Sequence, residues 1–177
     1  MVSAIHHRIV SRVLEREGGI RDVGDGKGLT RFGQTPEWLK TWRLDAPKTP
    51  AEAAGNYLVW MQLTRLEDLA SIDEDLGDVV IDWAVISGEE TPIAKLQKHV
   101  GVRTDGRLGP ITLAAVEAWA TAGRCRQLAR LVLADREEFN GRLLGSQKVD
   151  RREWAAGWGI RIAAQARRLA ADPAAKK

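Results

Sequence analysis

The sequence has little cysteine and little histidine. Among its 177 residues it has one cysteine, Cys125, which excludes a disulfide framework and a metal site built from several thiolates. Two of its three histidines are the neighbours His6 and His7, which cannot lie on one face of a helix. The composition therefore favours neither a metal site built from cysteine thiolates nor one built from histidines.

Long apolar runs are also absent. No stretch approaches the roughly 20 residues that a membrane-spanning helix needs. The first ten residues, MVSAIHHRIV, lack the basic start and apolar stretch of a secretory signal, so we expect the chain to remain in the cytoplasm where it is made. A composition of 44% hydrophobic and 29% charged residues is typical of a globular protein, and the length fits one domain.

The net charge of +3 conceals an asymmetry along the chain. Residues 1–123 carry 14 basic and 18 acidic side chains, a balance of −4, whereas residues 124–177 carry 13 and 6, a balance of +7. A basic C-terminal third indicates an anionic partner, which could be nucleic acid, a lipid head group or a wall polymer. An ordinary terminal helix with a solvated basic face is the structural alternative, and the residues alone leave these possibilities open.

The dominant hydrophobic period is helical. Capping residues and the positions of proline and glycine predict helices over 4–17, 50–68, 74–87, 91–101, 110–123, 125–144 and 150–169. Residues 18–34 are rich in glycine and aspartate and have no helical period, which indicates a loop with a short extended piece at 29–32. We therefore predict a mainly α fold with a small β or irregular element near residues 20–35.

An acidic run lies in the middle of the chain: Asp73, Glu74, Asp75, Asp78 and Asp82. Its spacing matches no EF-hand loop, and acidic residues favour helix N-termini, so we expect a solvated helix start. Asp82 is different because it lies between Ile81 and Trp83 on an apolar helix. We expect it to be a buried hydrogen-bonding anchor.

Glu17 is the candidate for chemistry. It would lie in the last turn of the first helix, where unpaired carbonyl groups disfavour a negative charge and so favour a protonated carboxyl group. A protonated carboxyl group near neutral pH is what a general acid for glycosidic cleavage requires. Gly18-Gly19 beside it would let a bulky polymer approach the backbone. The alternative from spacing alone is a solvated glutamate followed by a glycine helix cap.

The segment EGGIRDVGDGKGLTRFGQT resembles the signature of phage-type N-acetylmuramidases, glycoside hydrolase family 108. That signature is Glu-Gly-Gly, an acidic glycine-rich loop, then Gly-x-Thr-x-aromatic-Gly-x-Thr. The residues that match it in order are Glu17, Gly18, Gly19, Asp25, Gly28, Thr30, Phe32, Gly33 and Thr35. The chain departs from the pattern at Ile20, where an aromatic residue is usual, at Lys27, which replaces a glycine, and at Gln34, which replaces an aliphatic residue.

The resemblance continues downstream and covers about residues 5–165. IDWAVISG (81–88) is similar to the family's Phe-Asp-x-Ala-Val-Asn-Ser-Gly helix, and LQKHVGVRTDGRLGPITLAAV (96–116) resembles its short peptidoglycan-binding segment. Taken alone, the latter is also explained as a turn that leads into a proline-started helix. The resemblance implies a lysozyme-like helical domain, with a muramidase region at 1–88 and a helical peptidoglycan-binding segment at 89–177 in the same globule.

The same resemblance implies hydrolysis of the β-1,4 bond between N-acetylmuramic acid and N-acetylglucosamine. Glu17 would protonate the leaving oxygen, and Asp25 or Asp22 would supply a second carboxylate that stabilises positive charge or activates water. Thr30 would assist from the loop. The residues expected to contact substrate are Asp22, Gly28, Phe32 and Gly33. No metal or organic cofactor is expected.

The expected setting is that of an endolysin. Made in the host cytoplasm without a signal peptide, it would reach the periplasm or wall after a separate protein has permeabilised the membrane. Its partner would be peptidoglycan glycan strands, with the basic C-terminal third attaching it to an anionic wall or outer membrane; we expect a monomer and no nucleic acid. The alternative function is a non-catalytic peptidoglycan-binding or virion-associated module of the same fold.

Overall fold

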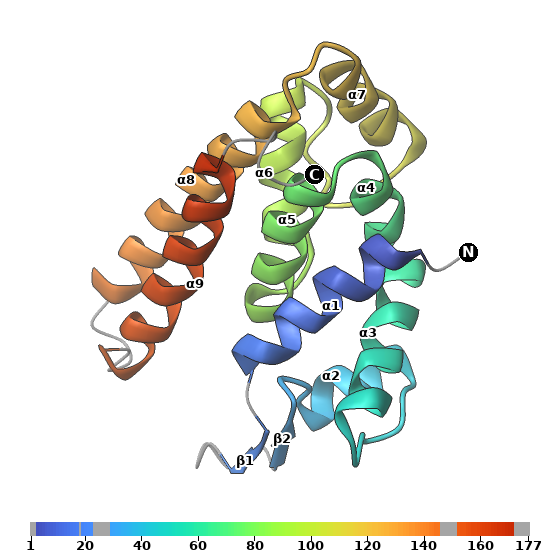
Figure 1. Ribbon diagram of the computed structural model, residues 1–177, viewed down its shortest axis with the longest axis vertical. Helices are drawn as coiled ribbons and strands as arrows, with labels where there is room; N and C mark the ends of the chain where they lie inside the picture. Colours follow the sequence, from blue (N-terminus) through green and yellow to red (C-terminus); the bar gives the residue numbers. More distant parts are fainter. Residues whose placement is uncertain (1–2, 18, 23–28, 146–151, 172–177) are drawn as a thin grey trace. The chain divides into compact units, whose positions relative to one another are not determined.

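The fold is mainly helical, as the sequence predicts (Figure 1). The computed structural model describes residues 3–17, 19–22, 29–145 and 152–171. Within these ranges it contains nine helices and one two-stranded antiparallel hairpin. The hairpin lies in the segment near residues 20–35 where a small β element is predicted.

The chain divides into two compact units, residues 1–71 and 72–177. The elements that begin in the first unit are α1 (Ala4–Glu17), β1 (Ile20–Asp22), β2 (Leu29–Arg31), α2 (Pro36–Trp42), α3 (Pro50–Thr64) and α4 (Leu66–Ile72). The second contains α5 (Glu74–Ser87), α6 (Glu90–Val100), α7 (Pro110–Thr121), α8 (Cys125–Gly145) and α9 (Arg152–Ala170). The boundary at residue 88, which concerns function, stays a prediction.

Most helix ends lie where the sequence places them, and two departures have local causes. The helix expected over 50–68 is interrupted, because Arg65 adopts a left-handed conformation with φ +64° that ends α3 before α4 begins. The short helix α2 was not predicted. It begins with Thr35, whose hydroxyl accepts a hydrogen bond from the Trp38 amide, and Pro36 follows as its first residue.

In the first unit, α1 packs on α3, and buried apolar residues of both helices form the core. His6 belongs to this core, since it is only 2% exposed. Its Nδ1 accepts from the Ser3 amide at 3.1 Å, so its Nε2 donates to the Glu67 carbonyl at 3.1 Å and contacts the Ser71 hydroxyl at 3.0 Å. Nδ1 of His6 thus binds the start of the chain, and Nε2 binds α4.

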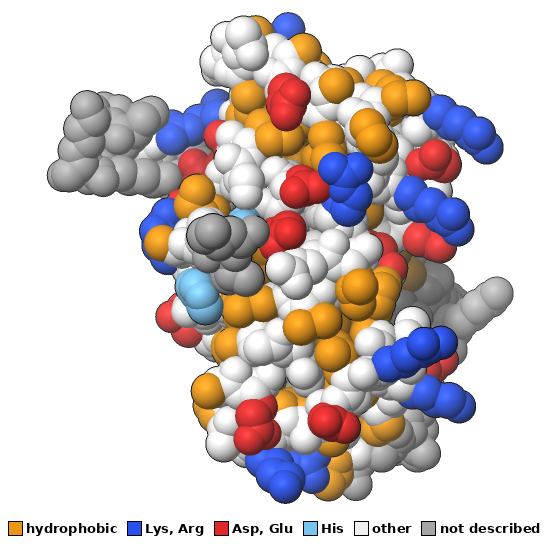
Figure 2. Space-filling view, turned by 90° about the vertical axis from the view of Figure 1, so that its right-hand side faces the viewer, with side chains coloured by type: hydrophobic (Ala, Val, Ile, Leu, Met, Phe, Trp, Pro, Cys, Tyr) orange, Lys and Arg blue, Asp and Glu red, His pale blue; other side chains and the backbone are white. Residues whose placement is uncertain are grey.

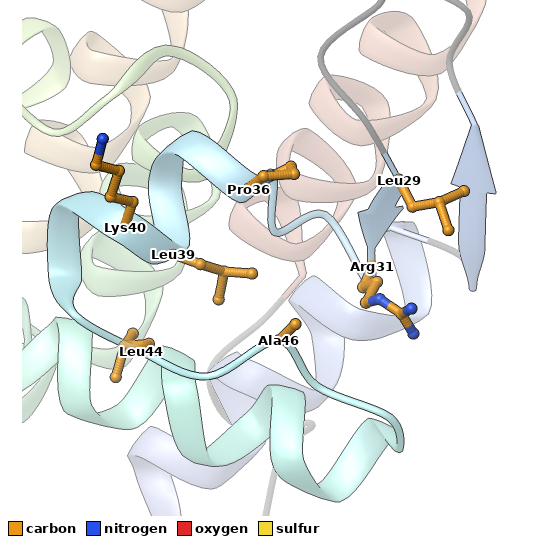
Figure 3. A pocket seen from close by; sticks show the side chains of 7 residues that line it. All are labelled: Leu29, Arg31, Pro36, Leu39, Lys40, Leu44 and Ala46. Carbon is orange, nitrogen blue, oxygen red and sulfur yellow. The ribbon is translucent and has the colours of Figure 1, made fainter.

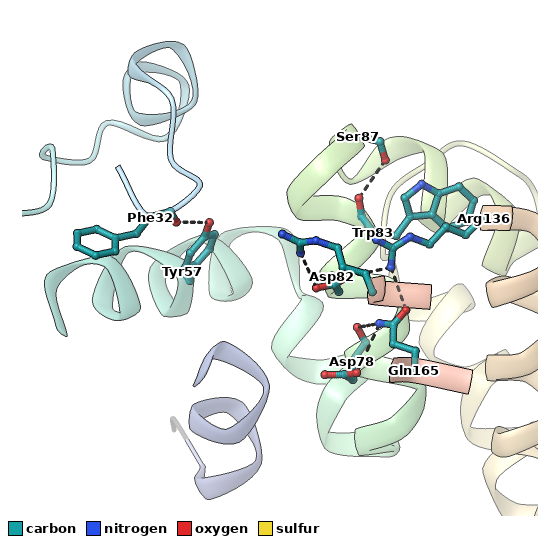
Figure 4. A network of polar contacts seen from close by, with 9 residues as sticks. Phe32, Tyr57, Asp78, Asp82, Trp83, Ser87, Arg136 and Gln165 are labelled. Atoms are coloured by element: carbon teal, nitrogen blue, oxygen red, sulfur yellow. Dashed lines mark hydrogen bonds and ion pairs between the residues drawn. The ribbon is translucent and has the colours of Figure 1, made fainter. Parts of the chain in front are cut away.

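In the second unit, α5 packs against α6, α8 and α9 around a buried carboxylate. Asp82 is fully buried and accepts hydrogen bonds from Arg136 Nη1 at 2.8 Å and from Arg161 Nη1 at 3.0 Å. Arg136 Nη1 also donates to Gln165 Oε1 at 2.9 Å, and Gln165 Nε2 donates to the Asp78 carbonyl at 3.0 Å (Figure 4). The prediction of a buried anchor at Asp82 is confirmed.

The acidic run does form a helix start, as predicted. The prediction that this helix start is solvated is wrong. Asp73 caps α5 by accepting from the Leu76 amide at 2.8 Å. Asp78 is 1% exposed, and the two acids that follow Asp73 pair with Arg168 of α9. Burial alone would lower the pKa of Arg168, yet hydrogen bonds from its guanidinium to Asp75 and Glu74 hold the pKa above its ordinary value. Glu74 and Asp75, which the sequence alone assigns to the surface, therefore neutralise an arginine that is distant in sequence.

This pairing changes the meaning of the charge asymmetry. Counted by compact unit, residues 1–71 carry 10 basic and 9 acidic side chains, and residues 72–177 carry 17 and 15. Basic and acidic side chains also alternate on the face drawn in Figure 2. The excess of +7 in the C-terminal third is therefore offset largely within its own unit.

We expect Asp82→Asn to lower the free energy of unfolding by about 3–5 kcal/mol, because it removes the carboxylate charge that two buried guanidinium groups share. Urea unfolding of the purified protein measures the change. The control is Glu138→Gln, which breaks an exposed pair with Arg142 on α8 and should cost less than about 0.5 kcal/mol. Equal effects of the two substitutions would contradict a supporting role for the buried pair.

Candidate functional site

The hairpin that follows α1 organises the candidate site. Its register pairs Ile20 with Arg31, Arg21 with Thr30, and Asp22 with Leu29. Successive residues of a strand lie on opposite faces, so Thr30 lies on one face of the hairpin and its neighbours Leu29 and Arg31 lie on the other.

A tight turn follows β2 directly. The Arg31 amide donates to the Gln34 carbonyl at 3.0 Å, and the Gln34 amide donates to the Arg31 carbonyl at 2.9 Å. The two residues between them have positive φ, +52° at Phe32 and +82° at Gly33, as in a type I′ turn. Glycine adopts this conformation freely, whereas for phenylalanine it costs about 1 kcal/mol or more. The turn therefore stores strain at Phe32.

Side chains of α3 hold this turn. The Tyr57 hydroxyl donates to the Phe32 carbonyl at 3.0 Å (Figure 4). Gln34 is fully buried: its Nε2 donates to the Ala53 carbonyl at 2.9 Å, and its Oε1 accepts from Asn56 Nδ2 at 2.8 Å. The glutamine that stands where the muramidase signature has an aliphatic residue thus has its amide satisfied by α3.

The turn brings Gly33 against the carboxyl group of Glu17. Glu17 is the last residue of α1 and is partly exposed. A Cβ atom added at Gly33 would lie 2.5 Å from Glu17 Oε2 and 2.6 Å from its Cδ, which is closer than real Cβ contacts come. With any other residue at this position, the Glu17 side chain would have to move from the place it occupies here. Two residues that the sequence assigns to the site, sixteen positions apart, therefore meet in space.

The other predicted site residues are placed to different degrees. Thr30 and Phe32 are both partly exposed, on β2 and in the turn. Asp22 ends β1. Asp25 and Gly28 lie outside the described residues. The contacts of Asp22, Gly28, Phe32 and Gly33 with substrate, and the catalytic roles of Asp25 and Thr30, stay predictions.

Sequence reasoning missed Tyr57, Gln34 and Asn56 as supports of the site. A signal was present for the first of these, because Tyr57 is the chain's one tyrosine and lies among apolar residues of a predicted helix. A buried phenol needs a hydrogen-bond partner outside its own helix. The partner itself, the Phe32 carbonyl, had no signature in the sequence.

A pocket of about 440 Å³ lies beside the hairpin (Figure 3). Its lining is mostly apolar and consists of Leu29, Arg31, Pro36, Leu39, Lys40, Leu44 and Ala46. Since Leu29 and Arg31 lie on the hairpin face opposite to Thr30, the pocket is on the other side of the hairpin from the predicted catalytic threonine.

In the segment that resembles a peptidoglycan-binding motif, the polar side chains bind one another. Gln97 Nε2 donates to Asp105 Oδ1 at 2.8 Å, to the Arg107 carbonyl at 3.0 Å and to Thr112 Oγ1 at 3.1 Å. Its Oε1 accepts from the Gly106 amide at 2.9 Å. The hydrogen bond from Gln97 holds the pKa of Asp105 below its usual range. These matched residues build the turn that leads into α7.

Other reactive groups are less suited to catalysis. Burial, with a contribution from the charge of Asp73, raises the pKa of the Cys125 thiol to about 11, so it stays protonated at neutral pH. Among the described residues, no three His, Cys, Asp or Glu side chains gather as a metal ion would require. No helix in the described ranges is long and apolar enough to cross a membrane.

Comparison with solved structures finds a likeness over nearly the whole chain. The structure of Brucella abortus SagA superposes with a TM-score of 0.65 and 26% sequence identity, covering 96% of this chain and 97% of that one. No family model matches the sequence, and no curated protein matches it. The two chains therefore share a fold over nearly their whole length.

We expect Gly33→Ala to lower the free energy of unfolding by at least about 1 kcal/mol, because alanine disfavours a φ of +82° and the Glu17 side chain must also move away from the new Cβ. Gly19→Ala is the control, since nothing lies within 4 Å of its Cβ position and it should change stability by less than about 0.5 kcal/mol.

A double-mutant cycle isolates the contact between the two residues. In a Glu17→Ala background the added methyl group at position 33 has room, so Gly33→Ala should cost less there than in the wild type. Equal costs in the two backgrounds would show that the carboxyl group does not lie against the turn.

Proposed function

We propose that this protein hydrolyses the glycan strands of peptidoglycan as an N-acetylmuramidase, with Glu17 as general acid. The observation that carries the proposal is the contact between the Glu17 carboxyl group and Gly33. It joins the first residue of the motif that resembles family 108 muramidases to its last glycine. In support, the chain shares its fold with Brucella abortus SagA over 96% of its length.

The chemistry follows from where the carboxyl group lies. Glu17 is the last residue of α1, and the C-terminal end of a helix disfavours a negative charge. This position favours the protonated group, which would give its proton to the glycosidic oxygen as the sugar becomes oxocarbenium-like.

The second carboxylate of the proposed mechanism comes from the loop between the strands. Asp25, or Asp22 at the end of β1, would stabilise the positive charge or activate the attacking water. Thr30, on β2 and partly exposed, would orient that water or a sugar hydroxyl. The bond cleaved would be the β-1,4 bond between N-acetylmuramic acid and N-acetylglucosamine.

In this proposal the protein acts as an endolysin. It would be a monomer that leaves the host cytoplasm when a separate protein opens the membrane, and then lyses the wall. Attraction to an anionic wall would depend on cations such as the exposed Arg167 and only weakly on Arg161 and Arg168, whose charges are paired with acids of α5.

We expect Glu17→Gln to fold normally and to lose at least about 10²-fold in the rate of glycan hydrolysis, the usual contribution of a general acid. The rate is measured as reducing ends released from purified peptidoglycan. Mass spectrometry of the products identifies the bond, because a muramidase leaves N-acetylmuramic acid at the reducing end. The control is Glu15→Gln, an exposed position on the same helix.

Two outcomes would contradict the proposal. Hydrolysis by Glu17→Gln at the wild-type rate would remove Glu17 from the mechanism. A wild-type protein that binds the wall but releases no reducing ends would instead be a non-catalytic binding module.

A further inference from the structure

The turn at Phe32 and Gly33 does not hold its shape by its own preference. Type I′ turns favour Asn-Gly or Gly-Gly, and a phenylalanine at the first central position opposes the positive φ. Hydrogen bonds must offset this preference: two join Arg31 and Gln34, and the Phe32 amide donates to the Gly19 carbonyl at 3.1 Å. The Phe32 carbonyl needs a partner of its own, because a change of φ at this residue would move Gly33 away from Glu17.

Tyr57 is well suited to this task. Its hydroxyl donates to the Phe32 carbonyl at 3.0 Å, so it binds the strained residue itself. The ring is 2% exposed and packs with Trp38 and Trp60, whose ring centroids lie 5.6 and 6.1 Å away. A phenol fixed between two indoles has little freedom, and its hydroxyl presents a donor at a set position.

From this geometry we infer that Tyr57 is a positioning residue for the general acid. Its hydroxyl holds the left-handed turn, and the turn in turn holds Gly33 against the carboxyl group of Glu17. The catalytic consequence rests on the proposed function. The structural consequence is independent of the proposed function, because it concerns only the coupling between Tyr57, the turn and Glu17.

Tyr57→Phe removes the hydroxyl and keeps the ring. The Phe32 carbonyl then loses its partner, the turn relaxes, and Glu17 keeps its place on α1 with a less defined orientation. We expect kcat on soluble glycan fragments to fall about tenfold, less than the roughly hundredfold that a 1 Å misplacement can cost. KM should stay within about twofold, because the hydroxyl acts here through its hydrogen bond to the Phe32 carbonyl.

The pH profile separates positioning from a general loss of stability. A displaced Gly33 changes the surroundings of the Glu17 carboxyl group, so the alkaline limb of the kcat/KM profile should move relative to the wild type. The control is Thr64→Val, which removes another hydroxyl-to-carbonyl hydrogen bond of α3, from Thr64 to Trp60 at 2.8 Å. It should leave kcat and the profile unchanged.

A second background tests the strain directly. With Phe32→Gly the turn needs no external support, so adding Tyr57→Phe should cost less than about threefold in kcat. An equal loss in both backgrounds, or a pH profile that matches that of Thr64→Val, would overturn the inference.

One measurement is independent of activity. Because Tyr57 is the chain's one tyrosine, a ¹³Cζ-tyrosine label gives a single resonance that reports on the hydroxyl. Gly33→Ala should shift this resonance, and Gly141→Ala on α8, where nothing lies within 4 Å of the new Cβ, should not. If the wild type proves inactive but the resonance responds, the proposed function fails and the coupling stands; a resonance that is indifferent to Gly33→Ala overturns the coupling.

Discussion

The carboxylate of Asp82 determines how the second unit is built. A buried charge costs several kcal/mol unless it is paired and hydrogen-bonded, and Asp82 is fully buried. Arg136 of α8 and Arg161 of α9 both donate to it, so these two helices must meet α5, which lies far from them in sequence, at one carboxyl group. Replacing Asp82 removes the carboxylate that both guanidinium groups share, in a site where Arg136 is fully buried and Arg161 is 9% exposed.

The pairing of these buried charges also weakens the functional argument from the basic C-terminal third. The basic C-terminal third suggests an anionic partner when it is taken as a stretch of sequence. In the folded unit, Arg136, Arg161 and Arg168 serve as counter-charges for α5, and the unit as a whole carries 17 basic and 15 acidic side chains. The case for function therefore rests on the first unit, where a strained turn lies against a glutamate.

The sequence predicts what depends on local chemistry. The bounds of α1 and α5 follow from periodicity and capping, and the burial of Asp82 follows from its apolar neighbours. The features that the sequence does not predict depend on distant contacts. They are the left-handed conformation of Arg65, which divides the helix expected over 50–68, and the burial of Gln34 under α3. The sign of φ at Phe32 could not be predicted, because phenylalanine disfavours the conformation that Tyr57 and the flanking hydrogen bonds support.

The two motif glycines show how geometry separates a structural motif from a candidate site. Gly33 and Gly106 both have positive φ, and a Cβ at either would be too close to a glutamate. At Gly106 the close atoms are the backbone of Glu90, and the surrounding polar groups of Gln97, Asp105 and Thr112 bind one another. That glycine closes a turn. At Gly33 the close atoms are a carboxyl group, partly exposed at a helix end where a negative charge is disfavoured. The same residue type in the same backbone conformation completes a turn in one unit and, in the other, borders the carboxyl group that we propose as the general acid.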